Sequence, residues 1–126
     1  MDFPDDLKYH PEHMWVRLEG KGVATVGVSD YAQDQLGTVI YVDLPEVDQE
    51  VSVNEELGAV ESAKSVSDLV SPASGVVLAV NLDLEDQPDL INLEPYKGGW
   101  IARIKLEDPS ELDELYDAGE YEAELD

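Results

Sequence analysis

The stretch "GAVESAKSVSDLVSPASG", residues 58–75, predicts two strands that face each other across a tight turn. Valine and leucine recur on both sides of the turn, and small residues flank its centre at Ala63 and Lys64. Lys64 is the only cationic residue between Lys21 and Lys97, in a chain with 30 acidic and 7 basic residues. The sequence therefore predicts a β-hairpin with a single ammonium group at its tip.

Further short strands are predicted on both sides of this hairpin. Residues 22–29 ("GVATVGVS") are rich in Val and Thr, and "EGKG" at residues 19–22 is a turn signal before them. In residues 100–107 the apolar side chains share one face of a predicted strand: Trp100, Ala102, Ile104 and Leu106. Many short strands between frequent turns favour a mainly β fold, a sandwich or barrel with Trp15 and Trp100 in its core.

Two helices are predicted as additions to the strands. Ser29 is a good N-cap for a short internal helix over residues 30–36, and Gly37 suits the position after its last turn. A C-terminal helix is predicted at about residues 110–124, with Ser110 as its N-cap. Its apolar stripe consists of Leu112, Leu115 and Tyr116.

Length and composition restrict the class of protein to which the chain can belong. The chain has 126 residues, which predicts one domain over residues 1–126, and its 43% hydrophobic residues argue against a disordered chain. It has no cysteine, so disulfides and sulfur-based metal sites are excluded. The sequence shows neither a signal-peptide pattern nor an apolar run of membrane-spanning length, and the expected compartment is the cytoplasm.

The net charge of −23 restricts the partners of the chain. The phosphates of nucleic acids and the headgroups of anionic membranes would both be repelled by such a surface. The same charge destabilises the folded state through self-repulsion, which salt relieves. This excess of acids is typical of proteins from salt-accumulating halophiles, and protein partners are expected to present basic patches.

Lys64 meets the requirements for a lysine that another enzyme acylates. The small neighbours in "SAKS" (residues 62–65) leave room for an approaching enzyme, and the predicted strands hold the amine in a fixed place. No nearby lysine competes for the modification. Acylation would remove the charge of the amine. The ordinary alternative is a surface lysine without a function.

The segment around Lys64 closely resembles the lipoylation segment of the glycine cleavage system H protein family. The resemblance continues at residues 7–17, 24–47 and 90–105 and in the terminal helix, in the family's order, so it covers nearly the whole chain. It implies a barrel-sandwich hybrid fold, like that of lipoyl and biotinyl carriers. It also implies that lipoate is joined to Lys64 through an amide.

Three neighbours of the lysine match the family's motif. Glu61 and Ser62 precede Lys64 as they do in the family, and Asp68 follows it at the family's spacing. The resemblance implies that these residues belong to the cofactor-binding segment.

The family's function implies that this chain is a carrier and does no chemistry itself. In the family, the lipoyl group takes an aminomethyl group from a pyridoxal-phosphate glycine decarboxylase and delivers it to a folate-dependent aminomethyltransferase. A dihydrolipoamide dehydrogenase then reoxidises the dithiol. A lipoate ligase or lipoyl transferase is implied as the enzyme that loads Lys64, and the family suggests a monomer that meets its partners transiently.

The resemblance further implies that the loaded arm rests in a cleft of the protein, which excludes water. A carboxylate near the amine would hold it by a charge-assisted hydrogen bond. The family motif usually reads His-Glu-Trp, but here it reads His13-Met14-Trp15, so this glutamate is absent. Asp68 is the candidate that is left in the motif.

Other interpretations of the same residues stay open. One is an H-like protein that only relays lipoyl groups to other enzymes, which the altered Met14 permits. A lipoyl domain of a 2-oxoacid dehydrogenase would be shorter with Asp-Lys-Ala at its lysine, and a biotin carrier would place methionine on both sides. A hydrolase that uses paired acids belongs to a different class. His10 and His13 have no third ligand nearby, so no metal site is expected.

Overall fold

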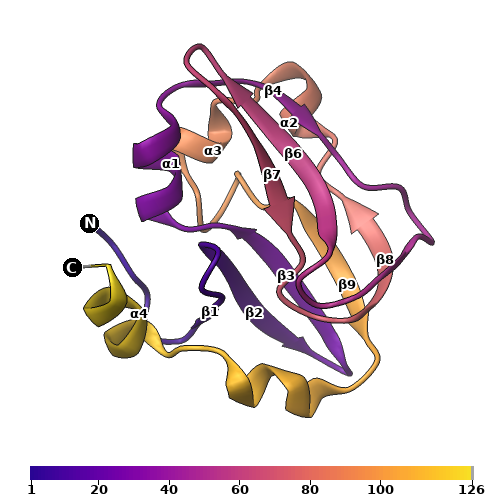
Figure 1. Cartoon of the computed structure of the whole chain (residues 1–126). Helices are drawn as coiled ribbons and strands as arrows, with labels where there is room; N and C mark the ends of the chain where they lie inside the picture. Colours follow the sequence, from indigo (N-terminus) through magenta and orange to yellow (C-terminus); the bar gives the residue numbers. More distant parts are fainter. Residues whose placement is uncertain (126) are drawn as a thin grey trace.

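The computed structural model describes residues 1–125, which form two antiparallel sheets with helices outside them (Figure 1). One sheet has six strands in the order β1-β2-β3-β9-β8-β5, and the other has three in the order β4-β6-β7. The strands are β1 (Lys8–Tyr9), β2 (Met14–Gly20), β3 (Val23–Val28), β4 (Val39–Asp43), β5 (Glu50–Val51), β6 (Glu56–Ser62), β7 (Val66–Val70), β8 (Gly75–Val80) and β9 (Ala102–Leu106). The helices are α1 (Asp30–Leu36), α2 (Asp83–Asp86), α3 (Leu90–Leu93), a 3-10 helix (Pro109–Glu114) and α4 (Ala118–Glu124).

This architecture confirms the predicted mainly β fold of the barrel-sandwich type. The main core lies between the sheets and is built from side chains of both, together with Leu36 of α1. Within residues 1–125, no helix is long and apolar enough to cross a membrane.

The two tryptophans differ in burial. Trp15 is fully buried, and its ring lies against Gly27 of the paired strand, where a Cβ atom would come within 2.7 Å of the ring. The indole N–H of Trp15 donates to the carbonyl oxygen of Pro95 at 2.9 Å. Trp100 is only partly buried, and the guanidinium of Arg103 lies over its ring at 4.3 Å. Trp15 belongs to a second buried cluster, which consists of Leu7, Tyr9, Trp15, Tyr96, Ala118 and Tyr121, and Trp100 packs against this cluster from its edge. The core prediction is therefore confirmed for Trp15 but not for Trp100.

Helix α1 begins and ends where the sequence predicts. The Ser29 side chain accepts a hydrogen bond from the N–H of Ala32 at 3.1 Å, which is an N-cap contact. Gly37 has a φ of 78°, and its N–H donates to the carbonyl oxygen of Gln33 at 3.1 Å. The side chain of Asn92 donates to the carbonyl oxygen of Gly37 at 2.8 Å, which ties this helix end to α3.

The C-terminal segment is not the single helix predicted for residues 110–124. A 3-10 helix comes first, and its cap is Asp108 rather than Ser110. The chain then becomes extended at Tyr116, which exchanges backbone hydrogen bonds of 2.8 and 2.9 Å with Tyr9 of β1. This contact with a distant strand interrupts the helix.

A new helix, α4, starts after the interruption. Asp117 and Glu120 form a capping box at its first turn. The ring of Tyr121 stacks on Tyr9 with centroids 4.8 Å apart, and Phe3 meets Tyr121 edge-on at 5.4 Å. These contacts hold the C-terminal helix beside the N-terminal segment (Figure 1).

Candidate functional site

Lys64 is exposed at the tip of the β6–β7 hairpin. Glu61 pairs with Val66 across the hairpin, and the N–H of Ser62 donates to the carbonyl oxygen of Ser65 at 2.8 Å. Within residues 1–125, the Nζ atom of Lys64 forms no hydrogen bond or ion pair, and only its backbone N–H is engaged. A large partner can therefore reach the amine, while the backbone that carries it is fixed.

Ser62 supports this turn from inside the protein. Its side chain is buried, and its hydroxyl oxygen faces the backbone N–H groups of Lys64 and Ser65 at 3.4 and 3.3 Å. Both N–H groups lie in the three-residue connection between β6 and β7, where strand pairing offers them no other acceptor. This motif residue thus shapes the hairpin tip.

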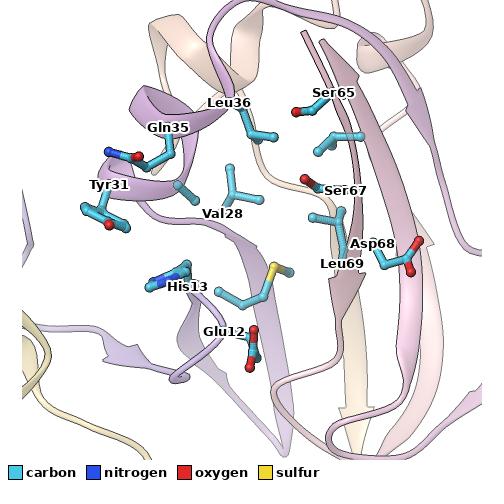
Figure 2. Close-up of a pocket in the computed structure, with 13 residues that line it drawn as sticks. Glu12, His13, Val28, Tyr31, Gln35, Leu36, Ser65, Ser67, Asp68 and Leu69 are labelled. Atoms are coloured by element: carbon cyan, nitrogen blue, oxygen red, sulfur yellow. The ribbon is translucent and has the colours of Figure 1, made fainter. Parts of the chain in front are cut away.

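Glu61 and Asp68 lie on the outer face of the three-stranded sheet. Leu69 is buried, so its neighbour Asp68 points to the other side of β7, and Figure 2 shows its carboxylate directed away from Leu69. A hydrogen bond with Asp68 and the negative charge of that residue raise the pKa of Glu56 above its usual value. Asp68 borders the cleft described below, but its carboxylate points to the outer face.

A cleft of about 350 Å³ lies beside the hairpin, between α1 and β7 (Figure 2). One face of α1 forms one wall, at positions that helical spacing brings together. The lining residues are Tyr31, Ala32, Gln35 and Leu36 of α1; Met14, Val28, Val60, Ser67, Asp68 and Leu69 of the strands; and Glu12, His13 and Ser65 of the connecting turns.

The Lys64 side chain lies over the end of α1, at the rim of this cleft. A Cβ atom on Gly37 would be 3.1 Å from Cε and 3.6 Å from Nζ of Lys64. The two residues before Gly37, Gln35 and Leu36, line the cleft. A group attached to Nζ therefore starts within reach of the cleft.

His13 breaks the alternation of side chains ahead of β2. Its φ of 73° lies in the left-handed region, its N–H donates to the carbonyl oxygen of His10 at 2.9 Å, and its own carbonyl accepts from Ser29 at 2.9 Å. As a result, Glu12, His13 and Met14 all line the same cleft. In a regular strand Glu12 and Met14, two positions apart, would share one face and His13 would point to the other, so the left-handed residue is what allows all three to share the lining.

His10 has a structural role. It is buried, and its Nδ1 accepts from the N–H of Glu12 at 2.9 Å, so the ring proton is on Nε2 and is donated to Oδ1 of Asn54 at 2.6 Å. Both nitrogens of His10 are therefore occupied. In the part of the chain that the structure describes, no cluster of three His, Asp or Glu residues could hold a metal ion.

Two small sheets with a lysine on an exposed hairpin, beside a cleft, are the features of a lipoyl-type carrier domain. A family model described as "Glycine cleavage H-protein" matches residues 7–126. The glycine cleavage system H protein of Vibrio campbellii is 55% identical over 115 residues, which cover 91% of each chain. That of Symbiobacterium thermophilum is 54% identical over 120 residues, covering 95% of this chain and 93% of the relative.

The fold comparison agrees with the sequence comparisons. The crystal structure of a glycine cleavage system H protein from Mycobacterium marinum matches with a TM-score of 0.89 and 36% identity, and covers 98% of both chains. The chain belongs to the glycine cleavage H-protein family. It is accordingly a carrier of covalent lipoate in the glycine cleavage system and not an enzyme.

Proposed function

We propose that Lys64 carries the lipoyl group and that the chain, as one carrier domain in the cytoplasm, shuttles an aminomethyl group. The glycine decarboxylase would load this group, the aminomethyltransferase would take it up, and dihydrolipoamide dehydrogenase would reoxidise the arm. A lipoate ligase or lipoyl transferase would attach lipoate beforehand. The observation that carries the proposal is the exposed Lys64 amine on a fixed hairpin whose side chain leads to a cleft.

The cleft fits an aliphatic arm with a polar end. Its walls include the apolar side chains of Leu36, Val60 and Leu69, which exclude water from a bound chain. Glu12 and His13 supply ionisable groups at another part of the lining. Lipoate, when attached, supplies a disulfide whose reduced form has two thiols, one of which bears the aminomethyl group.

Glu12 is the residue that we assign to the amine of the loaded arm. Met14 stands where the family motif has glutamate, and it is buried and uncharged. Asp68 also lines the cleft, but its carboxylate is directed away from Leu69, toward the outer face of the sheet. Glu12 is exposed and lines the cleft, so its carboxylate is free to accept a charge-assisted hydrogen bond from an ammonium group.

Two measurements on Lys64→Arg test the carrier role. Intact mass after incubation with lipoate ligase should show one lipoyl adduct on the native chain and none on the variant. Exchange of the glycine carboxyl with bicarbonate, catalysed by the partner decarboxylase, should be abolished in the variant. Lys97→Arg changes another exposed lysine and should behave as the native chain. Exchange that survives in Lys64→Arg would refute the assignment.

A second candidate function is the relay of lipoyl groups to other enzymes. The observation that favours it is Met14, because the family's glutamate for the amine is absent. In that case the lipoylated chain would not support exchange with the decarboxylase, but it would donate its lipoyl group to a lipoyl domain of a 2-oxoacid dehydrogenase. One lipoylated sample, tested both for exchange and for donation of its lipoyl group, therefore distinguishes the two functions.

A further inference from the structure

The imidazole of His13 is held in place from the C-terminal helix. Its Nδ1 lies 2.7 Å from the hydroxyl of Tyr121, and that hydroxyl lies 2.7 Å from Oγ of Ser29. Ser29 Oγ also accepts the N–H of Ala32 as the cap of α1. Tyr121 is itself buried and stacked on Tyr9. The orientation of the His13 ring is therefore set by α4 and by the start of α1.

The other ring nitrogen of His13, Nε2, has no hydrogen-bond partner within residues 1–125. Every buried side-chain nitrogen and oxygen of residues 1–125 has a hydrogen-bond partner. Nε2 has none there, so it is not fully buried, and His13 belongs to the lining of the cleft. The ring of Tyr31 lies 4.9 Å away, and Glu12 is next to His13 in the chain and in the lining. An imidazole nitrogen and a carboxylate thus border one cavity.

We propose that His13 is a second contact for the ammonium group of the loaded arm, and that protonation of His13 releases this group. The inference rests on the carrier function proposed above and adds a positioning residue and a pH dependence to it. A neutral imidazole accepts a hydrogen bond from an ammonium at Nε2. An imidazolium would present a donor and a positive charge at the same atom, and would repel the ligand.

The proton arrangement that this contact requires is available in the structure. If Nε2 accepts, the ring proton is on Nδ1 and is donated to the oxygen of Tyr121, whose own proton is then donated to Ser29. Burial raises the pKa of Tyr121 to about 12, so its hydroxyl stays protonated at neutral pH. Binding of an ammonium group would therefore select the Nδ1–H tautomer of His13.

The surroundings of His13 favour its neutral form. Burial is the main cause that lowers the pKa of His13, and the nearby His10 acts in the same direction. The carboxylate of Glu12 opposes them. The other titratable groups that face the ring are the hydroxyls of Tyr31 and Tyr121, which carry no charge when protonated. His13 is thus neutral at neutral pH and becomes charged on acidification.

Imidazole nitrogen NMR on the lipoylated, histidine-labelled chain tests this directly. The reduced arm can be loaded without any enzyme, because a thiol, formaldehyde and ammonia combine to an aminomethyl sulfide with release of one water. We expect loading to shift His13 to the Nδ1–H tautomer and to lower its pKa further. A tautomer and pKa that do not change on loading would overturn the proposal.

Hydrolysis of the loaded arm gives a second, independent readout. The reverse reaction consumes one water and yields the thiol, formaldehyde and ammonium, and its rate is compared with that of the same adduct on free dihydrolipoamide. In the native chain, protection should be lost as pH falls through the His13 pKa measured by NMR. His13→Asn, a residue that tolerates the left-handed backbone, should remove this pH step.

Tyr121→Phe has a matched control in Tyr9→Phe. The Tyr9 hydroxyl donates to the carbonyl oxygen of Pro4 at 2.8 Å, in the same aromatic cluster but without contact to His13. Tyr121→Phe should speed hydrolysis by about five-fold, the typical share of one hydrogen bond, whereas Tyr9→Phe should not. Equal rates in the two variants would contradict the role of His13. If the adduct on the native chain hydrolyses as fast as the adduct on free dihydrolipoamide, the proposal that the loaded arm rests in the cleft is wrong.

Discussion

Replacing Gly37 by alanine tests whether the Lys64 arm runs across the end of α1. Gly37 has a φ of 78°, which an L-residue adopts only at a cost, and the new Cβ would lie 3.1 Å from Cε of Lys64. Gly20 provides the control, because its φ is 94° and nothing lies within 4 Å of a Cβ placed there. Both alanine variants strain the backbone, but only Gly37→Ala meets the arm.

The Gly20 control separates the backbone cost from the cost of moving the lysine. A left-handed alanine costs about 1–2 kcal/mol relative to glycine, so both variants should lose that much free energy of unfolding. For a domain of this length, the loss corresponds to about 3–5 °C in Tm per kcal/mol. In Gly37→Ala the lysine must also move aside. A side-chain torsion displaced by about 30° costs about 0.5–1.5 kcal/mol, which lowers the population of the arm over α1 by about 2- to 12-fold.

The assay uses the absence of cysteine from the chain. Iodoacetamide added to the lipoylated, reduced protein alkylates only the thiols of the arm, so the rate reports how often the arm is outside the cleft. We expect Gly37→Ala to react about 2- to 12-fold faster than the native chain, and Gly20→Ala to react at the native rate. Denaturant titrations verify that both variants are equally destabilised. Equal alkylation rates in the two variants would refute the path of the arm over Gly37.

Three further outcomes are expected. The midpoint of thermal unfolding should rise between about 0.1 and about 1 M NaCl, because screening relieves the self-repulsion of a chain with a net charge of −23, and a constant or falling midpoint would contradict this. Ser62→Ala should lower the free energy of unfolding by about 1–2 kcal/mol in urea titrations, because two turn N–H groups lose their acceptor. Ser62→Ala should also slow lipoylation of Lys64 in a mass-spectrometric time course. A lipoylation rate equal to that of the native chain would contradict a role of this turn in presenting Lys64. His13→Asn should remove a loss of stability below about pH 6.5. Since burial lowers the pKa of His13 in the folded state, the unfolded chain binds more protons in that window and acid favours unfolding. The native-minus-variant difference in urea titrations isolates His13 from the carboxylates, and a difference that does not vary with pH would contradict this.

Local signals were sufficient for the parts of the fold that bring Lys64 to the surface. The cap at Ser29 and the glycine at Gly37 act within one helical turn, and both appear in the structure as predicted. The hairpin around Lys64 likewise depends on two adjacent strands and a short turn. Strand alternation beside the apolar Leu69 puts the side chain of Asp68 on the outer face, a direction that the motif match, which left Asp68 as the candidate for the amine, did not reveal.

The features that escaped prediction depend on contacts between distant segments. The C-terminal helix is broken at Tyr116 because that residue pairs with Tyr9, more than one hundred positions earlier in the chain. The left-handed backbone of His13 is secured by Ser29, from the far end of the next hairpin. Tyr121 reaches His13 only because α4 packs beside the N-terminal segment. No local pattern encodes these three contacts, and two of them shape the cleft.

The burial of the carboxylate that binds the amine determines how strongly this contact depends on solvation and on salt. A glutamate in place of Met14 would be almost fully buried, since the methionine side chain is 1% exposed, whereas Glu12 is exposed at the cleft. An exposed carboxylate loses less solvation when it binds an ammonium group, but salt screens its attraction more strongly. The hydrogen bond from the ligand to the neutral imidazole of His13 is much less sensitive to ionic strength. In the proposed site, His13 therefore supplies the part of the binding that persists at high salt, and Glu12 supplies the part that discriminates charge.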